Sequence, residues 1–106
     1  MIKVKFFHSK NDAPLGFAIS GHSGYAEAGA DIVCSAVSSA AYMAANTIIE
    51  IMQIDADAEV SDGMMKVTIP KQSADNAKDI LLGLELHIKE LAEQYPQNVT
   101  ITTTEV

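Results

Sequence analysis

The spacing of apolar residues switches along this chain between a two-residue period and a helical period, and the order of these periods limits its fold. Strict alternation predicts strands, and apolar residues spaced three and four apart predict helices. The segments expected to be strands are Met1–His8, Leu15–His22, the later part of Ile54–Asp62, Met65–Ile69 and Asn98–Val106. The two segments expected to be helices are Ile32–Gln53 and a second that starts at Ser73 or Asp75 and ends near Tyr95.

The resulting order, ββαββαβ, predicts an α/β (α+β) fold with a mixed sheet of about five strands. Two helices are expected to cover one face of that sheet. Turn residues between Ser9 and Pro14 predict that the first two strands form a hairpin, and Asp62-Gly63 is the strongest hairpin signal in the chain. A length of 106 residues supports a single domain over 1–106.

Composition limits the cellular setting that we expect. One cysteine in the whole sequence cannot form an internal disulfide, and a free thiol is typical of a reducing cytoplasm. We find no secretory signal in MIKVKFF, and no apolar run that we judge long enough to cross a bilayer. These features predict a cytoplasmic protein without a membrane partner.

The formal net charge is −7, with scattered basic residues. This balance disfavours a nucleic-acid surface, which needs clustered lysine and arginine, and favours a basic partner. On charge alone, however, solubility is the simpler explanation.

The stretch from Gly21 to Ser38, GHSGYAEAGADIVCSAVS, concentrates the residues that can do chemistry. It holds one of the three histidines, His22, and the only cysteine, Cys34. We expect Ser23–Ala30 to be a mobile loop and Asp31 to cap the following helix, which makes Cys34 its third residue. A thiol near a helix N-terminus, with an imidazole returned towards it, can form a thiolate nucleophile and its base.

The neighbours of this pair have less specific roles. Asp31 is expected at least to cap the helix, and beside His22 it would orient the ring. Ser38, one turn beyond Cys34, can contact the thiol or the substrate, or bond back to its own helix.

Other interpretations compete with catalysis. A lone cysteine is commonly a small buried hydrophobe, and a histidine at a strand end is more often structural. A metal site is disfavoured because one Cys and one His lack two further ligands at suitable spacing. A redox sensor would lack a second cysteine to resolve the oxidised thiol. His8 and His87 have no evident partner in the sequence.

The same stretch resembles the signature of the ribosomal-processing cysteine protease family, Prp. The resemblance is carried by Gly21-His22, Gly24-Tyr25, Asp31-Ile32-Val33-Cys34 and Ala36-Val37-Ser38. Elsewhere the chain agrees with the family in length, opening strand and two-helix plan rather than in motif.

The resemblance implies a function that composition and spacing do not supply. It implies an endopeptidase that removes the short N-terminal extension of bacterial large-subunit ribosomal protein twenty-seven, with Cys34 as nucleophile and His22 as general base and acid. Asp31, Ser38 and Gly21 would be supporting residues, and Ser23, Gly24, Tyr25 and Gly29 would belong to a substrate loop. The family implies a homodimer, no cofactor and no metal. The alternative is a non-catalytic ribosome-associated binding protein in which Cys34 is structural.

Overall fold

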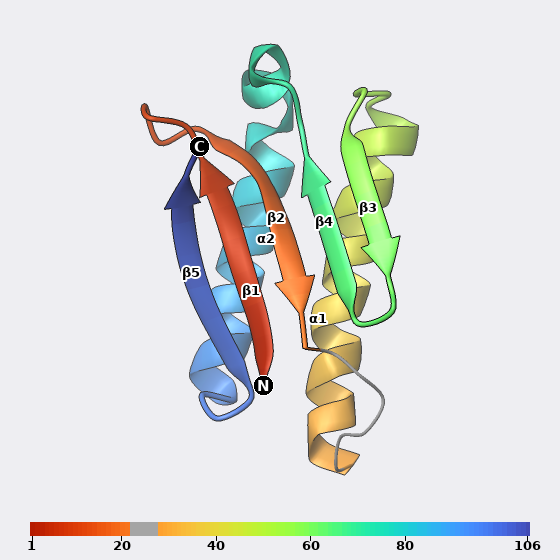
Figure 1. The fold of residues 1–106 in the computed structure, drawn as a ribbon, viewed down its shortest axis with the longest axis vertical. Helices are drawn as coiled ribbons and strands as arrows, with labels where there is room; N and C mark the ends of the chain where they lie inside the picture. Colours follow the sequence, from red (N-terminus) through yellow and green to blue (C-terminus); the bar gives the residue numbers. More distant parts are fainter. Residues whose placement is uncertain (22–27) are drawn as a thin grey trace.

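The computed structural model describes the backbone of residues 1–21 and 28–106, and the side chains of residues 1–21 and 32–106. It has two layers, with five strands in one layer and both long helices on one face of that sheet (Figure 1). This arrangement confirms the predicted fold class and the order ββαββαβ. The elements are β1 (Ile2–His8), β2 (Pro14–Ser20), α1 (Ala28–Asn46), the π-turn η1 (Thr47–Ile51), β3 (Asp57–Ser61), β4 (Met64–Thr68), the 3₁₀ turn η2 (Lys71–Ser73), α2 (Ala74–Gln94) and β5 (Val99–Glu105).

The strands lie in the order β3-β4-β2-β1-β5. Three neighbouring pairs are antiparallel, including the two predicted hairpins β1–β2 and β3–β4. The last strand, β5, instead runs parallel to β1, with Ile2 opposite Val99 and His8 opposite Glu105. Such parallel pairing needs a long crossover connection. In this chain the last step of that connection is α2, which leads from β4 across the helical face to β5.

The core lies between the sheet and the helices, and alternation along the strands fills it. Phe6, Phe17 and Val67 are fully buried on the covered face of the sheet, and Val37 and Ile88 bury against them from the two helices. Burying one such side chain contributes about 1.5–3 kcal/mol relative to leaving it exposed. In β3, at the edge of the sheet, every residue is exposed instead, Val60 at 61%.

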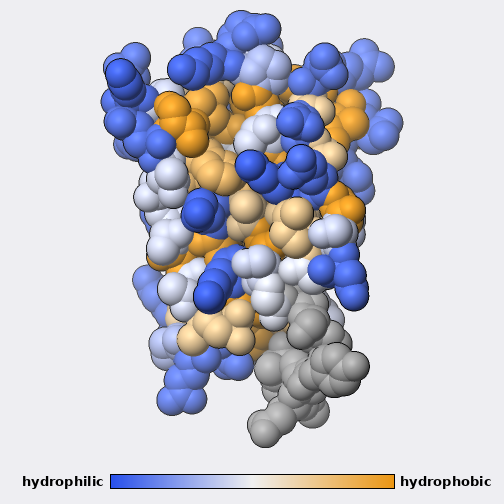
Figure 2. Space-filling view, viewed as in Figure 1, coloured by the Kyte–Doolittle hydropathy of each residue, from blue (hydrophilic) through white to orange (hydrophobic). Residues whose placement is uncertain are grey.

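The other face of the sheet is uncovered and carries hydrophilic side chains among smaller ones (Figure 2). Lys3, Lys5 and Lys66 are exposed there, and the ammonium group of Lys66 lies 5.5 Å from the centroid of the Phe7 ring. Gly16 lies on this face with φ +152°, and a Cβ atom there would collide with the carbonyl oxygen of Val67. The absence of a side chain at Gly16 thus permits the close approach of β4.

Helix α1 differs from the prediction at both ends. It begins at Ala28, so Gly29 and Asp31 lie inside it and Asp31 is not its N-cap. The alanine-rich segment from Ala28 has enough helix propensity to extend the helix beyond the capping residue. At the other end the helix gives way to η1, where Met52 donates its N–H to the carbonyl oxygen of Thr47.

The expectation that no apolar run is long enough to cross a bilayer is wrong. Within the helical segment α1–η1, residues Ile32–Ile51 are long enough and apolar enough to do so, judged by length and composition alone. Val37, Ala41 and Ile48 of this segment belong to the protein core. Other apolar side chains of this segment lie on its outer side, where Met43 is 54% exposed.

Candidate functional site

Cys34 lies in the second turn of α1, as the seventh residue of that helix rather than the predicted third. Its side chain is half-buried and packs against the core, and its thiol is free. The favourable effect of a helix N-terminus falls off within the first turn. The predicted contribution of the helix terminus to thiolate formation therefore does not hold.

Helical spacing determines what surrounds this thiol. Val33 and Val37 are fully buried on either side of Cys34 along the chain, and they fix the rotation of the helix against the sheet. Ser38, one turn further on, is half-buried like Cys34. The thiol and the Ser38 side chain thus follow each other along one stripe at the edge of the core, where solvent still has access.

Gly21 directs the chain as it leaves β2. Its φ is +85°, a conformation that favours glycine, and a Cβ atom would collide with the carbonyl oxygen of Met1. Its N–H donates a 3.2 Å hydrogen bond to the carbonyl oxygen of Gly63. Both the backbone conformation and the lack of room for a side chain therefore require glycine at position 21. The sequence analysis predicted only a supporting role for this residue.

The other predicted site residues are described only in part. His22, Ser23, Gly24 and Tyr25 lie outside the described residues, as does the side chain of Asp31, and Gly29 belongs to the first turn of α1. Figure 1 shows that β2 ends and α1 begins towards the same end of the long axis of the molecule. The proximity of His22 to Cys34 remains a prediction.

Sequence reasoning missed a cluster of titratable side chains around His8. Its Nδ1 lies 2.7 Å from Oδ1 of Asp12, and its Nε2 lies 2.8 Å from Oε2 of Glu85 on α2. Burial lowers the pKa of His8, but the hydrogen bonds and charges of the two carboxylates outweigh it and raise the pKa above its ordinary value of 6.5. Asp12 is only four residues from His8, so this part of the cluster has a local signal in the sequence, whereas Glu85 is 77 residues from His8 and has none.

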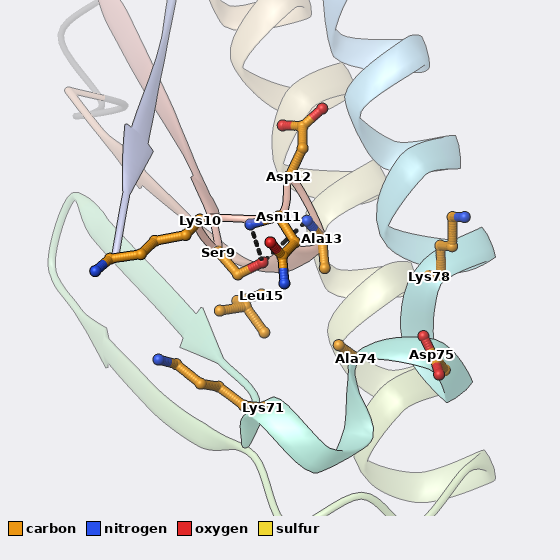
Figure 3. A pocket seen from close by; sticks show the side chains of 10 residues that line it. All are labelled: Ser9, Lys10, Asn11, Asp12, Ala13, Leu15, Lys71, Ala74, Asp75 and Lys78. Carbon is orange, nitrogen blue, oxygen red and sulfur yellow. Dashed lines mark hydrogen bonds between the residues drawn. The ribbon is translucent and has the colours of Figure 1, made fainter.

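A cleft of about 620 Å³ lies beside this cluster, between the β1–β2 turn and the start of α2. Ser9 Oγ accepts hydrogen bonds from the N–H groups of Asn11 and Ala13 and shapes its wall (Figure 3). Lys10 and Lys71 extend to one side of the cleft, and Lys78 lies on the other. With neither a cysteine nor a histidine in its lining, this cleft has no group for thiol chemistry.

Within the described part of the chain, no group of three His, Cys, Asp or Glu side chains is arranged to hold a metal ion. The chemistry that the described residues offer is therefore that of one accessible thiol on a helix.

Comparison with known proteins identifies that chemistry. Residues 1–100 match the sequence profile of the family described as cysteine protease Prp. The ribosomal processing cysteine protease Prp of Bacillus subtilis (strain 168) is 23% identical over 109 residues, which cover 97% of each chain.

Solved structures show the same fold. The essential ribosomal processing protease Prp from S. aureus, in complex with a substrate peptide, superposes with a TM-score of 0.89 at 23% identity, over 98% of this chain and all of that one. A second structure of the S. aureus protease, with a covalently linked product peptide, has a TM-score of 0.85 at 24% identity over the same shares. SMU.848 from Streptococcus mutans has a TM-score of 0.87 at 27% identity, over 100% of this chain and 99% of that one. With a match over almost its whole length and a single, half-buried cysteine on α1, the chain belongs to the Prp family of cysteine proteases.

Proposed function

We propose that this protein is an endopeptidase that removes the short N-terminal extension of bacterial large-subunit ribosomal protein twenty-seven, with Cys34 as its nucleophile and His22 as its general base and acid. One observation carries the nucleophile assignment. The chain belongs to a family of cysteine proteases and contains a single cysteine, so no other residue can supply the thiol.

The proposed mechanism begins with transfer of the Cys34 thiol proton to His22. The thiolate attacks the scissile carbonyl carbon, and the imidazolium then protonates the leaving amine, which leaves an acyl-enzyme thioester. Water, deprotonated by His22, attacks the thioester carbonyl. Collapse of that intermediate releases the carboxylate product and returns the proton to Cys34.

Two lines of support bear on the substrate. The relatives from B. subtilis and S. aureus are named ribosomal processing proteases, and the S. aureus enzyme has been seen with a substrate peptide and with a covalently linked product peptide. The net charge of −7 suits a basic ribosomal protein. By the same family relationship we propose a homodimer in the cytoplasm, where the thiol stays reduced.

The alternative, a binding protein with a purely structural cysteine, has less support. Cys34 is half-buried rather than enclosed, and the family is one of cysteine proteases. A single assay separates the two functions. Purified protein is mixed with a peptide that copies the extended N-terminus of the ribosomal protein, and products are identified by mass spectrometry.

We expect one cut by the wild type and at least about a thousandfold slower cleavage by Cys34→Ala and His22→Ala, because each variant removes a group that acts in the reaction. Ser35→Ala is the matched control, since Ser35 is exposed on the next position of α1. It should cleave at the wild-type rate. Cleavage by folded Cys34→Ala would refute the assignment of the nucleophile.

A further inference from the structure

The uncovered face of the sheet, which is the face in view in Figure 2, has a hollow of about 480 Å³ over β2, β1 and β5. Lys3 on β1 lies between Ser20 of β2 and Thr100 of β5 in the pairing register. Lys5, two residues further along β1, has Ala18 as its neighbour on β2. The short side chains of β2 therefore leave open space beside two long lysine side chains.

This hollow is a basic site in an acidic protein. The chain has 14 aspartates and glutamates against 7 lysines and arginines, yet no carboxylate of the described residues lines the hollow. Both ion pairs of the described residues are made by His8, so neither Lys3 nor Lys5 has a carboxylate partner among them. The strand pairing places Asp57 and Glu59 on this face too, but on the edge strand β3, with β4 and β2 between them and β1. Two ammonium groups in such surroundings attract an anion.

Hydroxyl groups beside the lysines add hydrogen-bond donors to these charges. Ser20 and Thr102 line the hollow, and neither hydroxyl donates to another described residue, whereas the hydroxyl of Thr100 donates to the sulfur of Met1 at 3.0 Å. A phosphate group has three strong acceptor oxygens and carries nearly two negative charges at neutral pH. Two ammonium groups and two hydroxyls match these requirements, because hydrogen bonds between charged groups are the strong ones.

Larger anions suit this surface less well. Strands β1 and β2 each pair on both sides, so their backbone groups are not available to an extended peptide. Single-stranded nucleic acid is held largely by stacking on aromatic rings. The aromatic residue that the described strands place on this face, Phe7, is 9% exposed and lies beneath the ammonium group of Lys66. A net charge of −7 would also repel a long polyanion or an anionic membrane.

We propose that this hollow binds the phosphate group of a small molecule, through the ammonium groups of Lys3 and Lys5 and the hydroxyl groups beside them. Its volume of about 480 Å³ lies within the range of small-molecule sites, so an organic body attached to the phosphate has room over Ala18 and Met64. A second copy of this chain is a poorer occupant, because a two-fold interface through this face would bring lysines against lysines. The hollow faces away from the helices, whereas Cys34 packs against the core from α1, so binding is separate from the proposed cleavage.

NMR titration at constant ionic strength tests this proposal with adenosine monophosphate, inorganic phosphate and adenosine as probes. We expect adenosine monophosphate to shift the amide signals of Lys3, Lys5 and Ser20 with a Kd below about 1 mM, and adenosine to bind at least about tenfold more weakly. Inorganic phosphate should shift the same signals. A lower Kd for the nucleotide would assign the site to phosphate esters, and a lower Kd for inorganic phosphate would assign it to the free anion.

The double variant Lys3→Gln, Lys5→Gln removes both charges and should raise the Kd at least about tenfold. Lys66→Gln is the matched control, because it removes the same charge from the same face outside the hollow, and it should change the Kd by less than about twofold. Ala18→Leu keeps every charge but fills the hollow, so it should also weaken binding at least about fivefold.

The proposal is overturned if neither phosphate probe binds, if adenosine binds as well as its monophosphate, or if Lys66→Gln weakens binding as much as the double variant does. Tighter binding of a glutamate-rich peptide or of a short oligouridylate would also overturn it, in favour of a polymer as the occupant. So would a dimer in sedimentation that the double variant separates, because a second copy would then cover the hollow.

Discussion

His8 is held between two carboxylates that reach it from different parts of the chain, Asp12 in the following turn and Glu85 on α2. The Glu85 side chain is 7% exposed, so its charge depends on the imidazolium for compensation. This contact fastens the β1–β2 turn to the middle of the crossover helix. It is a structural contact at the end of the molecule away from Cys34.

The raised pKa of His8 makes this contact pH-dependent. The stabilisation is fully present below the unfolded pKa near 6.5, and it is lost as the pH rises through the higher folded value. We expect Glu85→Gln to lower the free energy of unfolding by about 1–3 kcal/mol at pH 5.5. The loss should be smaller at pH 9, because the protonated fraction of His8 falls as the pH rises.

Urea unfolding of both proteins at each pH, with NMR titration of His8, measures this effect. A difference in stability that is equal at the two pH values would show that Glu85 acts by packing alone.

At this scale the sequence predicts the residues of the thiol site but not the His8 cluster. Cys34 and His22 stand in one short stretch of unusual composition, so their types and spacing by themselves suggest chemistry. The partnership of His8 with Glu85 depends on how α2 lies across the sheet. No local pattern in the sequence encodes that placement.

At the scale of elements, two glycines differ in whether a side chain could be added at their positions. Gly16 on β2 has φ +152° and lies against the backbone of β4, whereas Gly83 on α2 has open space where a Cβ atom would be. We expect Gly16→Ala to destabilise the protein by roughly 2–4 kcal/mol through strain and collision. Gly83→Ala should stabilise it by about 0.5–1 kcal/mol.

Thermal and urea unfolding of the two variants under identical conditions compares these effects directly. The substitution is the same in both, so differences in side-chain chemistry cancel. Equal destabilisation by both would contradict the different surroundings of the two glycines.

The end of the first helical segment offers a further stabilising change. Gln53 follows η1 with φ +55°, where glycine is the usual residue, and Ile54 donates its N–H to the carbonyl oxygen of Ile48. We expect Gln53→Gly to raise the free energy of unfolding by about 0.5–1 kcal/mol, because the left-handed conformation strains a residue with a side chain. Gln53→Ala, which keeps the strain, should give no gain in the same denaturation experiment.

Local patterns predict most elements, and the errors lie where local signals compete. The strands and the Asp62-Gly63 hairpin follow from alternation and turn chemistry, which neighbouring residues determine. The start of α1 does not follow from local patterns. Asp31 resembles an N-cap, whereas Ala28 and Ala30, which precede it in the chain, favour an earlier start of the helix. The parallel pairing of β5 with β1 joins opposite ends of the chain, so neither strand's own sequence specifies it.

At the scale of the whole molecule, both layers carry charges of both signs. The uncovered sheet face carries Lys3, Lys5 and Lys66 together with Glu59 of β3, which lies opposite Lys66, and α2 carries Asp79 and Glu90 as well as Lys78 and Lys89. A net charge of −7 nevertheless gives the molecule a negative field at long range. A basic substrate, as in the proposed function, would be drawn towards it.

This field makes the proposed cleavage sensitive to salt. Raising NaCl from about 50 to about 500 mM shortens the screening length to a few ångströms, so we expect KM for a basic peptide to rise about three- to tenfold while kcat stays nearly constant. Initial rates over a range of peptide concentrations at each salt concentration separate the two constants. A peptide with the same cleavage segment and glutamines in place of its lysines is the control, and its KM should change by less than about twofold. If salt lowered kcat instead of raising KM, the charge would act on the chemical step or on folding rather than on capture of the substrate.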